Sequence, residues 1–115
     1  MSTNCITKVY NGNDCILCLY RHWDGDSHGQ ELVDFLKDKR LMYGYHNETL
    51  NEAFNGMGCL AAALVAHFKT EIGNFYLMPV NTMMDYEYNY RIDDSNGKIR
   101  VEMFHNEKFT TLLGS

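Results

Sequence analysis

The residues best suited to chemistry are four consecutive side chains of different types at the end of an apparent strand: Arg21, His22, Trp23 and Asp24. A guanidinium group binds phosphate or carboxylate through parallel hydrogen bonds, and an indole ring stacks on planar groups. Polar residues at a strand end are held by a rigid scaffold and still reach solvent. The segment is therefore a candidate ligand-binding site, to which we add Tyr43 and Tyr88 as candidate aromatic contacts.

The same four residues support more than one kind of binding. A small, anionic, nucleotide-like ligand would place its phosphate on Arg21, stack a base on Trp23 and hydrogen-bond with His22 and Asp24. Trp, Tyr and Arg are also enriched in protein–protein hot spots, so the segment equally suits docking onto another protein. A structural interpretation has Trp23 plugging the end of the core while Arg21 and Asp24 pair locally.

Signatures of catalysis are weak in this sequence. Ser27 follows His22 and Asp24 closely, but neither a nucleophile elbow nor a glycine-rich oxyanion turn accompanies it. The sequence also contains no P-loop and no dinucleotide-binding fingerprint. A small hydrolase that uses His22 and Asp24 remains an alternative, and a non-enzymatic protein is the favoured class.

Metal ligands of suitable type occur without a recognised spacing. Residues 24–29 resemble the start of an EF-hand loop, but its fifth and twelfth positions hold His28 and Phe35 instead of oxygen ligands. His22 and His28 with Asp24 or Asp26 fit no known transition-metal motif, and His28 is expected to be a solvated turn residue. We expect neither a metal nor a cofactor.

The four cysteines give no zinc signature. Cys15 and Cys18 form a C-x-x-C pair, but they lie in an apparent strand, where positions three apart face opposite sides. A second pair at zinc-ribbon spacing does not follow. The chain opens with polar residues, and its longest apolar run, Cys59 to Ala66, is too short to span a bilayer. We expect a cytoplasmic protein with reduced thiols and no membrane contact.

Size and charge restrict the function classes further. The chain of 115 residues fits one domain, residues 1–115. Its formal net charge of −5 argues against broad binding to nucleic acid, which needs a basic face. The acidic residues are scattered along the chain, as on an ordinary solvated surface. A homo-oligomer remains possible.

Two strands are expected to hold the candidate site in place. Residues 6–10 and 15–20 are rich in β-branched and aromatic residues, and Asn11-Gly12-Asn13-Asp14 between them is strong turn chemistry. The pattern predicts an antiparallel hairpin. Both faces of the second strand are apolar, which predicts a central strand.

Two helices are expected after a polar loop over residues 24–29. The first runs from Gln30 to about Arg40, with Asp26 or Ser27 as its cap. Residues 41–46 form a linker, and the second helix runs from about Thr49 to Thr70, with Asn47 or Thr49 as its cap. Gly56 and Gly58 inside it predict close approach of another backbone. His67 is expected to be partly buried beside its apolar face.

The last third of the chain returns to strands. Residues 75–78, 86–91, 99–104 and 109–113 have strand-like patterns, and Asp93-Asp94-Ser95-Asn96-Gly97 predicts a hairpin turn. The order ββ–α–α–βββ predicts an α+β domain. Its antiparallel sheet would have about five strands, with two helices packed on one face.

Three segments resemble a group of small uncharacterised proteins, many of them encoded by phages or prophages: Leu19–Gly25, Gly56–Lys69 and Tyr86–Ile92. In those proteins an R-H-W-D-G-Y-P stretch follows the first hairpin, whereas Asp26-Ser27 replaces the Tyr-Pro pair here. The resemblance implies a small protein made inside an infected bacterium, where blocking a host protein is a common role. We therefore expect a phage-type counter-defence protein that docks onto a host defence or metabolic protein, with sequestration of a nucleotide-like signal as the alternative.

Overall fold

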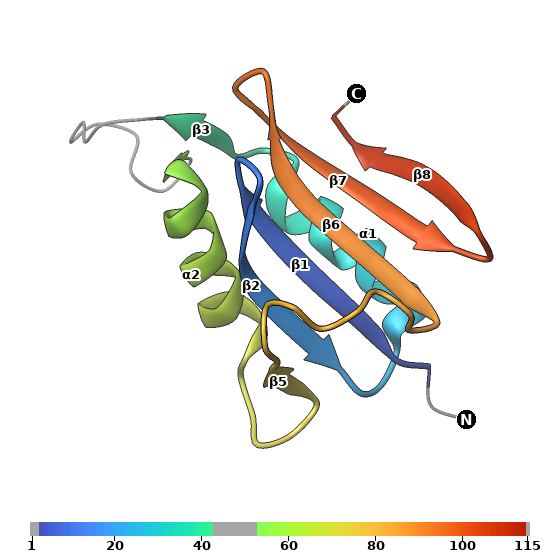
Figure 1. The fold of residues 1–115 in the computed structure, drawn as a ribbon. Coiled ribbons are helices and arrows are strands. Elements are labelled where there is room, and N and C mark those ends of the chain that lie inside the picture. The colour runs from blue at the N-terminus through green and yellow to red at the C-terminus, as the bar shows by residue number, and fades with distance from the viewer. Residues whose placement is uncertain (1–2, 43–52, 115) are drawn as a thin grey trace.

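The structure is a computed structural model that describes residues 3–42 and 53–114. Its main sheet has six strands in the order β5-β2-β1-β6-β7-β8 (Figure 1), and β3 and β4 form a separate pair. The elements are β1 Cys5–Asn11, β2 Asp14–Arg21, α1 Gly25–Leu36, β3 Arg40–Met42, β4 Ala53–Asn55, α2 Gly56–Phe68, β5 Phe75–Leu77, β6 Tyr88–Ser95, β7 Lys98–His105 and β8 Lys108–Leu113.

The α+β class is confirmed, but the prediction of a five-stranded antiparallel sheet is wrong. The sheet is mixed, because β1 and β6 are parallel while all its other neighbouring strands are antiparallel. Turn chemistry predicts how strands pair within a hairpin and carries no information on how two hairpins join. The long connection between β2 and β6 leaves the parallel arrangement open.

Both helices pack on the same face of the main sheet. Leu32 and Leu36 of α1 share one core with Leu60 and Leu64 of α2. The strands contribute side chains of alternate positions to this core: Cys5, Val9, Tyr90, Ile92, Ile99 and Val101. The predicted pair of helices on one face is therefore present.

The opposite face of β1 and β2 is covered by the segment between β5 and β6, which crosses in front of them in Figure 1. Met78 N donates a hydrogen bond of 2.9 Å to Cys18 O, and Lys8 Nζ donates one of 3.0 Å to Val80 O. With β5 and β1 at its two edges, β2 is the central strand that its two apolar faces predict.

Helix α1 begins at Gly25, five residues before the predicted start. The prediction of a loop over residues 24–29 is wrong, because Gly25 and Gly29 belong to the helix and allow it to pack closely against neighbouring residues. A Cβ atom on Gly29 would lie 2.9 Å from the Tyr90 ring, and one on Gly25 would lie 2.7 Å from the Asn4 backbone. Asp24, with a φ of 57°, precedes the helix without a side-chain cap, so the predicted caps at Asp26 and Ser27 are also wrong.

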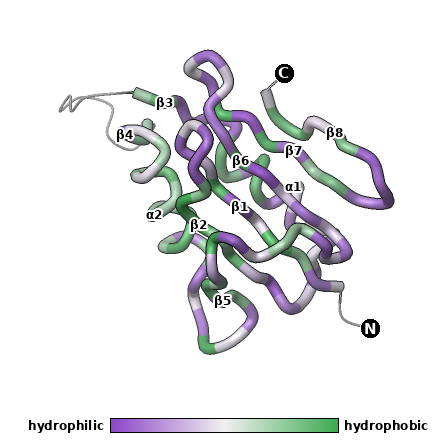
Figure 2. Tube along the Cα trace, in the orientation of Figure 1, coloured by the Kyte–Doolittle hydropathy of each residue, from purple (hydrophilic) through white to green (hydrophobic). Residues whose placement is uncertain are grey.

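Helix α2 begins at Gly56, because Gly56 has a φ of +82°, a left-handed conformation that interrupts a helix. Residues 53–55 form β4 and not the helical turn predicted there; the predicted caps, Asn47 and Thr49, lie outside the described residues. The close approach predicted at Gly58 is wrong, since no heavy atom would lie within 4 Å of a Cβ there. Figure 2 shows α2 as hydrophobic over most of its length.

Strand β6 continues through three residues of the predicted turn and ends at Ser95, leaving Asn96-Gly97 as the turn. Asp93 lies in the strand with only 5% exposure because two arginines compensate its charge. Arg100 Nη2 lies 2.8 Å and Arg91 Nε 3.1 Å from Asp93 Oδ2. Hydrogen bonds from these arginines outweigh the cost of burial and hold the pKa of Asp93 below its usual value.

Candidate functional site

The end of β2 divides the four predicted site residues between two environments. Arg21 lies opposite Cys5 in the sheet, on the face that the helices cover, and is 8% exposed. His22, Trp23 and Asp24 are exposed, and Trp23 retains 51% of its accessible surface. The structural interpretation places Trp23 as a plug at the end of the core, and the exposure of Trp23 shows that this prediction is wrong.

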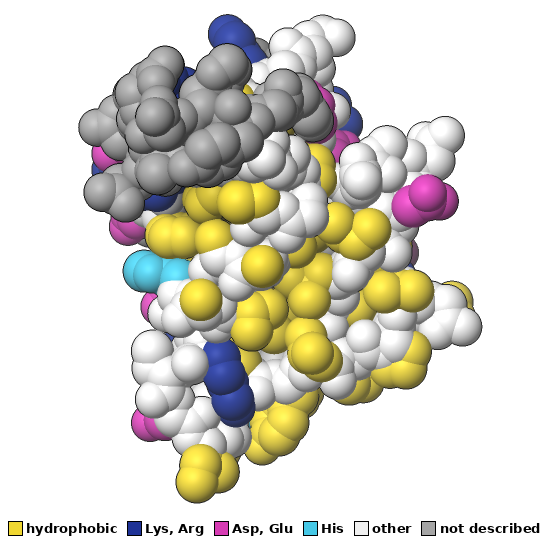
Figure 3. Space-filling view, turned by 90° about the vertical axis from the view of Figure 1, so that its left-hand side faces the viewer, with side chains coloured by type: hydrophobic (Ala, Val, Ile, Leu, Met, Phe, Trp, Pro, Cys, Tyr) yellow, Lys and Arg dark blue, Asp and Glu magenta, His cyan; other side chains and the backbone are white. Residues whose placement is uncertain are grey.

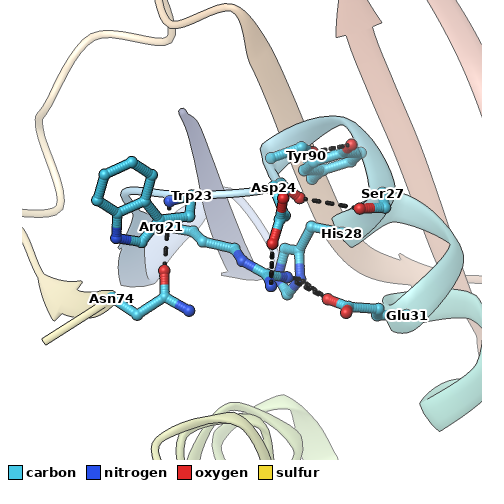
Figure 4. Close-up of polar contacts among 9 residues, drawn as sticks. Arg21, Trp23, Asp24, Ser27, His28, Glu31, Asn74 and Tyr90 are labelled. Atoms are coloured by element: carbon cyan, nitrogen blue, oxygen red, sulfur yellow. Dashed lines mark hydrogen bonds and ion pairs between the residues drawn. The ribbon is translucent and has the colours of Figure 1, made fainter. Parts of the chain in front are cut away.

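Arg21 is neutralised within the fold (Figure 4). Its Nη1 donates a hydrogen bond to Glu31 Oε1 on α1, whereas its nearest approach to Asp24 is 4.0 Å. The guanidinium carbon lies 5.0 Å from the centre of the Phe75 ring, a cation–π contact. The local Arg21–Asp24 pair is thus secondary, and the principal partner of Arg21 is a residue that lies ten positions away.

His28 is fully buried beside this ion pair, so its prediction as a solvated turn residue is wrong. Its Nδ1 lies 3.0 Å from Glu31 Oε1 and 3.1 Å from Arg21 Nη1. Burial lowers the pKa of His28 to about 4, and the positive charge of Arg21 acts in the same direction. Burial alone would raise the pKa of Glu31, but hydrogen bonds from His28 and Arg21 hold it below its usual value.

The start of α1 is fixed against the sheet by backbone contacts of Gly25. Gly25 N donates a hydrogen bond of 2.7 Å to Thr3 O, and Tyr90 Oη donates one of 2.7 Å to Gly25 O. On the other side of the corner, His22 N donates one of 2.9 Å to Asn74 O. These contacts hold Trp23 at a rigid corner between β2 and α1, close to Asn74 (Figure 4).

Five rings around this corner form a connected cluster, which we call the aromatic surface. Tyr20 lies 6.1 Å from His22, 6.2 Å from Tyr76 and 5.5 Å from Tyr86, measured between ring centroids. His22 meets Trp23 edge to face at 4.5 Å. Tyr76 is 50% exposed, so two large rings of the cluster face solvent.

Of the two other predicted contacts, the structure places only Tyr88, which is not part of the aromatic surface. Tyr88 lies on the helix-covered face of β6 and stacks on His105 with ring centroids 3.9 Å apart. Tyr43 lies outside the described residues.

A cleft of about 260 Å³ opens beside the Arg21–Glu31 pair. Its lining includes two carboxylates, Glu31 and Glu71, together with His67. His67 is exposed and stacks on Phe35 at 4.1 Å, so the prediction that it is partly buried is wrong. Among the described residues that line this cleft, Arg21 is the only Lys or Arg, and it is paired with Glu31.

The catalytic and metal hypotheses gain no geometric support from the described residues. His22 Nδ1 lies 3.0 Å from Tyr20 Oη, and no hydrogen bond joins His22 to Asp24 among the contacts of these residues. Within the same part of the chain, no three His, Cys, Asp or Glu side chains lie close enough to hold a metal ion. All four cysteines are free, and Cys18 is buried. None of the described helices is long and apolar enough to cross a bilayer.

Comparison with family models, with curated proteins and with solved structures finds no match for this chain. The site must therefore be interpreted from its own residues. Sequence reasoning did not identify Glu31, Tyr76 and Tyr86 as residues of the candidate site. The spacing of three between His28 and Glu31 would have placed both on one helix face, had the helix start at Gly25 been recognised.

Proposed function

We propose that this chain is a non-enzymatic binding protein that inhibits a host protein by docking onto it through the aromatic surface. The observation that supports this proposal is the exposure of Trp23 and Tyr76 on a rigid corner while Arg21 is neutralised inside. The resemblance to phage-encoded proteins supports a bacterial host protein as the partner. Trp and Tyr are also the residue types that most often anchor protein–protein contacts.

The aromatic surface has the rigidity that favours docking. Large rings lose little conformational entropy on binding, particularly when neighbouring rings already hold them in place. His22 contacts Trp23 edge to face, and Tyr20 contacts both His22 and Tyr76. Leu77, which follows Tyr76 in β5, is also exposed. Figure 3 shows that further hydrophobic side chains gather on one side of the molecule.

Charge indicates which partner surface would fit. Asp24 follows Trp23 and has a 73% exposed side chain, while exposed Asp85 and Glu87 flank Tyr86. The whole chain carries a net charge of −5. Lysine and arginine side chains of a basic partner surface would pair with these carboxylates and lie over the exposed rings.

Sequestration of a small anion around Arg21 is the weaker alternative. A phosphate at Arg21 would have to displace Glu31 and leave that carboxylate beside the new anion. Native mass spectrometry of the protein from a bacterial host separates the two hypotheses. Docking predicts a bare chain or a protein complex, whereas sequestration predicts an added small mass that disappears on denaturation.

The docking test begins with the immobilised full chain and bacterial lysate, followed by calorimetry with the purified partner. We expect Trp23→Ala and Tyr76→Ala each to weaken binding by about tenfold or more. Asp24→Asn should reduce the salt dependence of association, because it removes a charge at the rim of the contact.

Phe109→Ala is the matched control, since Phe109 is 71% exposed on β8, outside the aromatic surface. It should leave the affinity within about twofold of the unchanged chain. Equal weakening by Phe109→Ala, or unchanged affinity of Trp23→Ala and Tyr76→Ala, would rule out docking through this surface.

A further inference from the structure

A second region of the molecule gathers positive charge in an acidic protein. Five of the ten Lys and Arg residues form ion pairs with carboxylates or hydrogen bonds with backbone carbonyls: Lys8, Arg21, Lys69, Arg91 and Arg100. The other five are exposed or nearly so, and four of them line one cavity: Lys37, Lys39, Arg40 and Lys98. The fifth, Lys108, begins β8 at a different place.

This basic cavity has a volume of about 320 Å³. It lies where the end of α1, the start of β3, the β6–β7 turn and the end of β8 meet. No carboxylate of the described residues lines it. In the same part of the chain, Lys39, Arg40 and Lys98 have no carboxylate within 4.0 Å, and Lys37 has only an exposed partner, Asp34, at 3.6 Å.

The end of a helix explains only part of this cluster. A helix C-terminus favours nearby cations, which accounts for Lys37 just after Leu36. That effect fades within one turn, whereas Arg40 belongs to β3 and Lys98 to β7. Lys37, Arg40 and Lys98 line the cavity from the end of α1, β3 and β7, and no carboxylate of the described residues is part of the lining. These cations repel one another, and a bound anion would relieve that repulsion.

The remaining lining restricts the ligand further. Leu36, Ile99 and Leu113 give the cavity an aliphatic part, and no aromatic side chain of the described residues lines it. A nucleobase would therefore find no ring on which to stack. The volume is at the lower end of the range for small-molecule sites, roughly 300–1,000 Å³. We propose that the basic cavity binds a small organic phosphate that carries a short aliphatic group.

In this arrangement Arg40 forms paired hydrogen bonds to the phosphate oxygens, while the lysines supply charge from the rim. The aliphatic group contacts Leu36, Ile99 and Leu113 and leaves water. The site is separate from the aromatic surface and does not depend on the proposed docking.

The test uses the full chain, labelled with ¹⁵N, and monobutyl phosphate as the probe. We expect saturable shifts of the Gly97, Ile99 and Gly114 amides. Inorganic phosphate should bind about tenfold more weakly, because it lacks the aliphatic contact, and 1-butanol should not bind. Absence of saturable shifts with monobutyl phosphate, or equal affinity for inorganic phosphate, would overturn the proposal.

Two single variants, Arg40→Gln and Lys98→Gln, test the residues. Neither side chain has an ion-pair partner among the described residues, so both variants should keep the fold. Each variant should lower the affinity for monobutyl phosphate by about fivefold or more. Lys108→Gln removes the same charge elsewhere and should change that affinity by less than about twofold. Equal weakening by Lys108→Gln would show a general charge effect and overturn the site.

Binding to lipid vesicles distinguishes two sources of the bound phosphate, a lipid headgroup and a soluble phosphate ester. Co-sedimentation with phosphatidylglycerol vesicles that Arg40→Gln abolishes would identify a lipid headgroup as the bound phosphate. Binding of monobutyl phosphate without co-sedimentation would identify a soluble phosphate ester.

Discussion

Arg21 and Glu31 form an ion pair that joins the last residue of β2 to the second turn of α1. The pair turns the guanidinium inward, and the chain then places Trp23 on the outside of the corner. A contact between two elements thus separates the one buried residue of the four, Arg21, from the three exposed ones.

The first prediction separates the structural residue from the surface residue. Arg21→Ala should lower the free energy of unfolding by about 3 kcal/mol, because it removes a buried charge that partners Glu31. Trp23→Ala should cost less than about 1 kcal/mol, since half of the side chain is already in water. Chemical denaturation should be followed by circular dichroism, because Trp23→Ala removes the only tryptophan and with it the tryptophan fluorescence signal. Equal losses in the two variants would contradict this assignment.

The second prediction concerns the partner carboxylate. Glu31→Gln should destabilise the fold by about 1–3 kcal/mol, because it leaves the buried guanidinium of Arg21 without a countercharge. Asp34→Asn is the matched control on the same helix, where Lys37 and Asp34 form an exposed pair. That control should change stability by less than about 0.5 kcal/mol. If both variants gave the same urea midpoint, the ion pair would have no special structural role.

The third prediction is a loss of stability in mild acid through His28. The pKa of its imidazole is about 4 in the folded chain and about 6.5 when unfolded. Between these values the unfolded chain binds a proton that the folded chain does not, so stability falls as the pH falls. The loss should reach about 3 kcal/mol below the folded pKa and should be absent above the unfolded one.

This slope is measured as the free energy of unfolding at several pH values between about 6.5 and 4. His28→Gln should remove most of the slope, whereas His22→Gln, at an exposed position, should retain it. A slope that survives in His28→Gln would contradict this assignment, because the pKa values of Glu31 and Asp93 are held low and these groups act at lower pH.

The fourth prediction compares two glycines at the starts of the two helices. Gly25→Ala should destabilise the fold by about 1–3 kcal/mol, because its Cβ would lie 2.7 Å from the Asn4 backbone. Gly58→Ala should stabilise it by about 0.5–1 kcal/mol, because its Cβ would meet nothing within 4 Å. Thermal unfolding of the two variants checks both signs, and a shift in the same direction would contradict the packing described here.

Local patterns in the sequence predicted most strands of the main sheet and both helices, but not β3, β4 or the first turn of α1. Turn chemistry at Asn11-Gly12 and Asn96-Gly97 predicted the β1–β2 and β6–β7 hairpins, since these residues tolerate the φ values that tight turns require. The apolar residues on both faces of residues 15–20 predicted a central strand, and the apolar spacing of α2 predicted a helix packed on the core. The same reasoning singled out His22 and Trp23, two of the five rings of the aromatic surface.

Only the tertiary structure decided which residues meet. The parallel pairing of β1 with β6 joins segments far apart in the chain, and no local pattern specifies such a contact. The polar residues from Asp24 to Gly29 indicated a loop, yet the two glycines let α1 approach Asn4 and Tyr90 and bury His28. The neutralisation of Arg21 by Glu31 and the convergence of Arg40 with Lys98 arise in the same way. Residue types determine which interactions are possible, but packing of distant segments determines which charges are paired inside the fold and which remain at its surface.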